Sequence, residues 1–158
     1  MATTVEAANL TVTITETYNL NGVDYGNTMN KTYASNGQVS QRVMSIAAYG
    51  TGGTHVWTDI LGLTTVDGKG QVVKADYKYF RINNLDDTTG LTLRIFNGVD
   101  YLYFEVAAGS SAMFMDAGVD AQTAESHGNA VLVDITSISG QAQASATDID
   151  VEFVIVTA

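Results

Sequence analysis

Cysteine and proline are both absent from this chain of 158 residues. Because no thiol is present, the chain forms no disulfide, has no thiolate metal ligand and carries no cysteine nucleophile. Because proline is missing, tight turns have to come from glycine, asparagine and aspartate. The 15 glycines are therefore a first indication of many short turns, which is typical of a β-protein.

Basic residues are scarce, with seven lysines and arginines against seventeen acidic residues and a formal net charge of −10. A nucleic-acid-binding protein needs clustered lysine and arginine to contact phosphates, and an anionic membrane surface attracts the same residues. We therefore expect neither nucleic acid nor membrane among the partners. The acidity itself favours solubility, and it would also suit a partner with a basic face or a divalent cation.

Long hydrophobic runs are also missing. Apolar residues make up 46% of the chain, which argues against disorder. No run approaches the roughly 20 apolar residues that span a bilayer. The opening residues MATTVEAANL lack a basic region and a long apolar region, so we expect no Sec-type signal peptide. The length is that of one domain with a substantial core.

What the chain does contain is period-two alternation of apolar and polar residues. In Leu10–Leu20 apolar residues alternate with threonines, and Asn21-Gly22 then gives a hairpin-turn signal before a weaker strand at Val23–Tyr33. The stretch Tyr77–Met115 holds four strand patterns separated by three turn signals. We expect further strands at Gln38–Tyr49, His55–Leu63, Gln71–Ala75, Ala130–Ile138 and Thr147–Val156. A helix over Val39–Ala48 is the alternative for the first of these.

About ten short strands at a spacing of roughly 10–15 residues predict an all-β fold, a single antiparallel β-sandwich that is jelly-roll-like. Residues 1–9 are expected to form an N-terminal arm, and residues 10–158 the β-sandwich domain. Val154 and Val156 make both faces of the last strand apolar, so we expect the end of that strand to be covered on both sides.

No catalytic constellation stands out. His55 and His127 lack further ligands at metal-binding spacing, and Gly109-Ser110-Ser111 lacks the G-x-S-x-G pattern of a nucleophile elbow. The glycine-rich segments at residues 50–53 and 68–70 lack the phosphate-loop pattern. We therefore expect a non-enzymatic protein with no cofactor.

Three acidic groups are the sequence candidates for calcium. They are Asp86-Asp87, Asp116 with Asp120, and Asp148, Asp150 with Glu152. None has the spacing of an EF-hand. The last group points to one side of a strand, where carboxylates are usually solvated. A solvated face is the expected state, with calcium as the alternative.

Four of the eight tyrosines fall at i, i+2 positions on two predicted strands, Tyr77 and Tyr79 on one and Tyr101 and Tyr103 on the other. If the two strands are near neighbours, these side chains form an aromatic strip. Tyrosine is favoured at interfaces, so the strip would be a protein interface or a glycan-binding platform. Half-buried cross-strand packing is the structural alternative.

Two parts of the chain resemble small β-sandwich virion proteins of tailed bacteriophages. In such proteins an R-I-x-N-L-D turn leads into L-x-L-R-I and then into a tyrosine-containing strand that ends in V-x-A-G-x-S. The matching residues here are Arg81–Asp86, Leu91–Ile95 and Tyr101–Ser111. The ending D-I-D-V-E-F-V-I-V at Asp148–Val156 is also similar. The resemblance implies a structural protein and carries no functional residue with it.

The resemblance implies a virion structural protein without indicating head, neck or tail. The acidic composition suits an outward-facing protein that does not touch packaged DNA, so the expected function is that of a capsid decoration, cement or head-associated protein that stabilises the virion by subunit contacts. Its partners would be itself, as a homo-oligomer, and other virion proteins such as a major capsid protein, in virions assembled in the host cytoplasm. Exposed strand edges and the arm of residues 1–9 would pair with neighbouring subunits. A tail or neck component and a carbohydrate-binding, receptor-binding β-sandwich module are the alternatives.

Overall fold

The computed structural model describes residues 8–36, 38–50, 55–62, 77–98, 101–115, 135–144 and 146–157. The chain divides into two compact units, Met1–Gly37 and Gln38–Ala158. The sequence predicted an arm of residues 1–9 before one sandwich domain, and the structure adds a division at Gly37. The arm itself stays a prediction, because residues 1–7 lie outside the described part.

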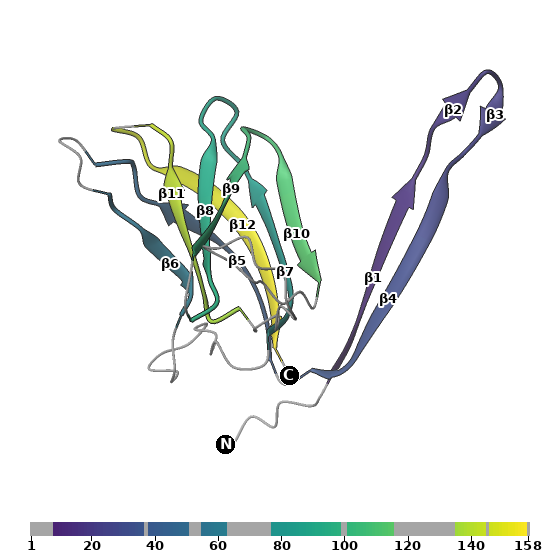
Figure 1. Cartoon of the computed structure of the whole chain (residues 1–158), viewed down its shortest axis with the longest axis horizontal. Helices are drawn as coiled ribbons and strands as arrows, with labels where there is room; N and C mark the ends of the chain where they lie inside the picture. The colour runs from purple at the N-terminus through teal and green to yellow at the C-terminus, as the bar shows by residue number, and fades with distance from the viewer. Residues whose placement is uncertain are drawn as a thin grey trace, which may run out of the picture. The chain divides into compact units, whose positions relative to one another are not determined.

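The first unit is an antiparallel hairpin of four strands, β1 (Ala8–Glu16), β2 (Asn19–Leu20), β3 (Val23–Asp24) and β4 (Asn27–Asn36) (Figure 1). Strand β1 pairs with β4, and β2 pairs with β3 at the tip. The turn between β2 and β3 consists of Asn21 and Gly22, with φ values of 53° and 82°. Asparagine and glycine tolerate this left-handed region, so the predicted hairpin turn is confirmed.

The second unit contains two antiparallel four-stranded sheets (Figure 1). The order in the first sheet is β10 (Ser111–Met115), β7 (Tyr77–Asn84), β12 (Ile149–Thr157) and β5 (Gln38–Ile46). The order in the second sheet is β6 (Thr58–Leu61), β11 (Ser137–Ala142), β8 (Leu91–Phe96) and β9 (Tyr101–Val106). The predicted all-β sandwich is thereby confirmed, whereas its jelly-roll-like connectivity stays a prediction.

Apolar and more polar residues alternate along the strands, so that one face of each sheet is buried in a common core. In β8 the buried residues Leu91, Leu93 and Ile95 alternate with partly exposed ones, as the sequence pattern predicted. Other large buried members come from both sheets: Phe80, Phe153, Leu61, Ile82, Ile138 and Ile155. Gly140 of β11 faces the first sheet, because a Cβ there would lie 3.2 Å from the side chains of both Ile46 and Leu91. A glycine at this position lets the sheets approach closely.

The segment Tyr77–Met115 runs between the two sheets instead of forming one meander. Strand β7 belongs to the first sheet, β8 and β9 pair as a hairpin in the second, and β10 returns to the first. After β7 the turn is held by Asp86 Oδ1, which accepts hydrogen bonds from the N–H groups of Thr88 and Thr89 at 2.8 and 2.6 Å. The turn before β10 contains Gly109 with a φ of 66°. Two of the three predicted turns therefore carry the chain from one sheet to the other.

The strand predicted over Gln38–Tyr49 is confirmed as β5, which ends at Ile46, and the alternative helix over Val39–Ala48 does not form. Of the strand predicted over Ala130–Ile138, residues 130–134 lie outside the described part. Residues 135 and 136 are not in a strand, and β11 begins at Ser137. The expected strand Gln71–Ala75 lies outside the described residues.

The end of β12 is buried on both faces. Ile155 belongs to the core, and Val156, which points the other way, is also fully buried. Val156 pairs with Val39 of β5 and with Tyr79 of β7, and Tyr79 is buried as well. The prediction that the end of this strand is covered on both sides is confirmed at Val156, while Val154 is half-buried.

Replacing Phe153 by alanine tests the core. This side chain is fully buried on β12, where its backbone pairs with Arg42 and Ile82. We expect the free energy of unfolding to fall by about 3–5 kcal/mol, because the change removes buried contacts and leaves a cavity. The control is Val43→Ala on the outer face of β5, where the side chain is 58% exposed. Its cost should stay below about 1 kcal/mol. Urea unfolding measures both, and equal losses would contradict a core between the sheets.

Candidate interaction surfaces

The four tyrosines singled out in the sequence lie on two different sheets. Tyr77 and Tyr79 are in β7 of the first sheet, whereas Tyr101 and Tyr103 are in β9 of the second. Tyr79 is only 5% exposed, and burial raises the pKa of its phenol. For Tyr77 the structure describes the backbone pairing with Thr157 and not the side chain. Because β7 and β9 are not neighbours, the four residues do not form one strip. Of the three tyrosines whose side chains are described, Tyr101 and Tyr103, which are 47% and 56% exposed, share an open surface.

Tyr101 and Tyr103 belong to a cluster on the outer face of the second sheet. Because β8 and β9 alternate, their outward residues pair across the strands as Arg94 with Tyr103 and Phe96 with Tyr101. Trp57, which directly precedes β6, lies against the same group. We call Trp57, Arg94, Phe96, Tyr101 and Tyr103 the aromatic face.

Arg94 holds the aromatic face together. Its guanidinium carbon lies 4.3 Å from the ring centre of Trp57 and 4.8 Å from that of Tyr101. Its Nη2 donates a hydrogen bond to Ser139 Oγ at 3.3 Å, and the Ser139 hydroxyl donates to Asp59 Oδ1 at 3.2 Å. The cation–π contacts and hydrogen bonds fix the arginine, and the nearby carboxylate offsets its charge.

The rings of the aromatic face form a rigid surface with polar groups at its edges. Phe96 and Tyr101 stack with ring centres 4.6 Å apart, and the ring centres of Tyr103 and Trp57 are 6.0 Å apart. Tyrosine and tryptophan supply large contact areas at little cost in conformational entropy. This arrangement can accept the flat face of a sugar ring or apolar side chains of another protein.

A second surface lies on one side of the hairpin. The register of β1 with β4 places Val12 opposite Lys31, Ile14 opposite Met29 and Glu16 opposite Asn27. Leu10 pairs with Tyr33 in the same register. Because side chains alternate along a strand, these four pairs project from the same side of the ribbon. The ribbon face, as we call it, consists of Leu10, Val12, Ile14, Glu16, Asn27, Met29, Lys31 and Tyr33. Tyr33 is buried at one end of this face, and Lys31 Nζ lies 5.6 Å from its ring centre.

The ribbon face is apolar at its centre and incompletely covered. Leu10, Val12 and Ile14 are half-buried, and Met29 is 46% exposed. A hollow of about 200 Å³ is lined by Ile14, Glu16, Asn27 and Met29. Such a surface is suited to packing against another apolar surface.

The opposite side of the ribbon is polar and hydrogen-bonded within itself. The hydroxyl oxygens of Thr11 and Thr32 are 3.1 Å apart, and the Thr13 hydroxyl donates to Asn30 Oδ1 at 2.8 Å. These cross-strand pairs satisfy that side in water. The tip of the hairpin adds exposed apolar side chains, namely Tyr18, Leu20, Val23 and Tyr25.

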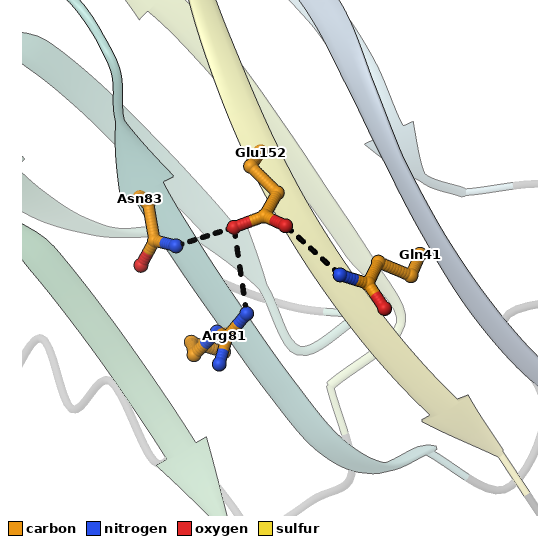
Figure 2. A network of polar contacts seen from close by, with 4 residues as sticks. All are labelled: Gln41, Arg81, Asn83 and Glu152. Atoms are coloured by element: carbon orange, nitrogen blue, oxygen red, sulfur yellow. Dashed lines mark hydrogen bonds and ion pairs between the residues drawn. The ribbon is translucent and has the colours of Figure 1, made fainter.

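Glu152 joins three strands on the outer face of the first sheet, as Figure 2 shows. Its carboxylate accepts hydrogen bonds from Gln41 Nε2 at 2.9 Å and from Asn83 Nδ2 at 2.6 Å. Arg81 Nη2 lies 3.5 Å from the same carboxylate. These contacts, that of Gln41 first, hold the pKa of Glu152 below its ordinary value. The ionised carboxylate therefore acts as a cross-strand acceptor.

Of the remaining acidic candidates that the structure describes, Asp86 and Asp148 serve a turn and a loop, and Asp150 lies exposed on β12. Backbone hydrogen bonds within its turn lower the pKa of Asp86, and Asp148 Oδ1 accepts from the N–H of Ala48 at 2.8 Å. His55 packs edge-on against Tyr49 with ring centres 5.0 Å apart. Within the described ranges, no group of three or more histidine or acidic residues is placed to hold a metal ion. Three further candidates lie outside those ranges: Asp116, Asp120 and His127.

Sequence reasoning missed Trp57, Arg94 and Phe96 as members of a surface site. The alternation in LTLRIF does carry a signal for Arg94 and Phe96, since Leu91, Leu93 and Ile95 occupy the other face. Trp57 has no local signal, because β6 joins the sheet only through its pairing with the distant β11.

No family model, curated protein or solved structure matches the chain. In the part of the chain that the structure describes, no helix has the length and apolar character needed to cross a membrane. The functional interpretation therefore rests on the two surfaces described above and on the sequence resemblance.

Lowering the pH should remove the contribution of Glu152 to stability. Its folded-state pKa lies below the ordinary value of 4.5, so its stabilising effect is complete above that pH. The effect is lost as the pH falls through the lower, folded-state pKa. Glu152→Gln should be less stable than wild type at neutral pH and should lose less stability below about pH 4.5, because glutamine does not titrate.

Urea unfolding at a series of pH values measures this difference. The control is Glu105→Gln on the exposed side of β9, which should keep the pH dependence of the wild type. Identical pH dependences in wild type and Glu152→Gln would contradict the role assigned to the carboxylate.

Proposed function

We propose that this chain is a non-enzymatic structural protein of a tailed-bacteriophage virion. It acts as a capsid decoration, cement or head-associated subunit and stabilises the particle by contacts with itself and with other virion proteins, such as a major capsid protein. The resemblance carried by Arg81–Asp86, Leu91–Ile95 and Tyr101–Ser111 supports the virion assignment. The hairpin of residues 8–36 supports a role in assembly.

The hairpin is the observation that carries the proposal. An isolated two-stranded hairpin is at best marginally stable in water, because it has too few neighbours to bury its apolar side chains. Strands β1 and β4 nevertheless present a continuous apolar row at Leu10, Val12 and Ile14. Contact with a neighbouring subunit supplies the missing burial, so that assembly and stabilisation of the hairpin occur together.

The charge of the chain supports an outward-facing position on a shell. Seventeen acidic residues against seven basic ones repel phosphate groups, so the protein suits a capsid surface better than packaged DNA. A tail or neck component would use the same kinds of contact, and the location of the protein within the particle separates these alternatives.

Particle composition tests the proposal. In purified virions of the virus that encodes this chain, mass spectrometry should find the protein in many copies and in the head fraction. Val12→Thr combined with Ile14→Thr should lower its copy number about tenfold or more, since two lost apolar contacts cost at least about 1.4 kcal/mol of docking free energy. Both replacements keep a β-branched side chain.

The matched control is Thr13→Ser on the opposite side of the ribbon, which should be retained at the wild-type level. Absence of the chain from wild-type virions would contradict the proposal. Recovery in the tail fraction would assign the chain to the tail or neck.

The aromatic face favours a second candidate function, carbohydrate binding by a receptor-binding β-sandwich module. Tyr101 and Tyr103 are about half exposed beside Trp57, and Arg94 fixes the rings in position. Rigid aromatic rings give apolar contact to one face of a sugar, and the tyrosine hydroxyls add hydrogen-bonding groups at the edge.

A glycan array probed with the intact protein tests this second function. Tyr103→Ala should weaken binding to any glycan found by about tenfold, as expected for an aromatic anchor. The fluorescence of Trp57, the single tryptophan of the chain, follows the titration. Val43→Ala on the other sheet serves as the control and should bind as wild type does. An array without hits at high protein concentration would exclude the candidate.

A further inference from the structure

We infer that the ribbon face binds the ribbon face of a second copy of this chain, with the two hairpins antiparallel and related by a two-fold axis at the Ile14–Met29 pair. This inference rests on the proposed assembly function and names the partner and the register. It is carried by the order of side chains along the ribbon, by their charges and by the distribution of charge between the two units.

The centre of the ribbon face is the part most suited to self-contact. Ile14 pairs with Met29, which is 46% exposed, and both line the hollow of about 200 Å³. A two-fold axis at this pair brings two pairs of apolar side chains together. Because Glu16 and Asn27 also line the hollow, each hollow then faces the Val12–Lys31 pair of the other copy. Such an isologous contact needs only one surface that is complementary to itself.

The flanking charges favour the antiparallel arrangement. On one side of the Ile14–Met29 pair lies Lys31, and on the other side lies Glu16. The two-fold axis reverses the direction of the second ribbon. The cross-strand pair that contains Lys31 in one copy therefore lies over the pair that contains Glu16 in the other copy. The pair with Glu16 in the first copy lies over the pair with Lys31 in the second. Two pairs of opposite charges then flank one apolar centre.

A parallel arrangement of the two ribbons is disfavoured by the same residues. In a parallel arrangement Lys31 of one copy would lie near Lys31 of the other, and Glu16 near Glu16. Like charges would then come together. Within one hairpin the two residues are four positions apart along the ribbon, roughly 13 Å by the strand rise, which is too far for an ion pair. Among the described residues, the one ion pair recorded joins Arg81 and Glu152. Within one hairpin Lys31 Nζ lies over the ring of Tyr33, 5.6 Å from its centre, and an ion pair of Lys31 with Glu16 can form only between copies.

The two units differ in charge, which favours contact through the hairpins. Residues 1–37 hold three acidic residues and one lysine, so −8 of the net −10 falls in residues 38–158. Two sandwich units therefore repel each other, whereas the ribbon faces carry one charge of each sign. Contact between two ribbon faces therefore meets less charge repulsion than contact between two sandwich units.

The area of contact indicates a reversible dimer. Nine-residue strands and the spacing between strands give a ribbon roughly 30 Å long and roughly 10 Å wide. Two copies then bury roughly 600 Å² in total, which is below the roughly 1,000 Å² of stable interfaces and fits only a weak, transient contact. We expect a dissociation constant on the order of 100 µM, which suits subunits that assemble only when concentrated on a particle.

Sedimentation equilibrium of the full-length chain tests the inference by charge reversal. Lys31→Glu and Glu16→Lys should each weaken dimerisation by about tenfold, because each replaces two opposite-charge pairs by like-charge pairs. The double variant carries both reversals and should restore dimerisation to within about threefold of wild type. Glu105→Lys changes the net charge by the same amount as Glu16→Lys and, lying on β9, should leave dimerisation unchanged.

Two results would overturn the inference. One is a wild-type chain that stays monomeric up to about millimolar concentration, well above the expected dissociation constant. The other is a dimer whose two single variants and double variant are weakened alike, without rescue. Either result would leave the proposed function open to its own test, the composition of purified virions. A hairpin that docks on a different virion protein would still keep the chain in the particle.

Discussion

Among the described strands, β1 and β4 pair only with each other, so the hairpin unit contains no further strand to cover its apolar side. This constraint distinguishes it from the sandwich unit. In the sandwich unit, two four-stranded sheets bury Phe80, Phe153 and Ile95 between them. In the hairpin unit, the same alternation of side chains leaves Met29 exposed and Val12 only half-buried. The same physical pattern therefore produces a closed core in one unit and a partly exposed apolar surface in the other.

Local features of the fold could be predicted from the sequence because they depend on neighbouring residues. Asn21 and Gly22 form the expected turn, since both tolerate positive φ. The alternation of Leu91, Leu93 and Ile95 predicts which face of β8 is buried. The double burial near Val156 also follows from the sequence, because consecutive apolar residues at the end of a strand require cover on both sides.

The arrangement of the tyrosines could not be predicted, because it depends on pairing between distant strands. Tyr79 lies in β7 beside β12, while Tyr103 lies in β9 beside β8, and no local pattern indicates that the chain changes sheets after Asp86. The cluster around Arg94 depends on the same long-range pairing, which brings Trp57 to its ring contacts through β6 and β11. Glu152 was expected to be a solvated acid, and the pairing of β12 with β5 and β7 makes it a cross-strand acceptor instead.

The central claim, that the hairpin depends on a neighbouring molecule for its stability, is tested most directly by amide hydrogen exchange of residues 8–36 at increasing protein concentration. In dilute solution the amides of β1 and β4 should exchange much faster than those of β8 and β12, because the ribbon opens locally at little cost in free energy. Their protection should rise as the chain associates, while that of the sandwich strands stays constant. Hairpin amides that are as protected as the sandwich core in the dilute monomer would contradict the account.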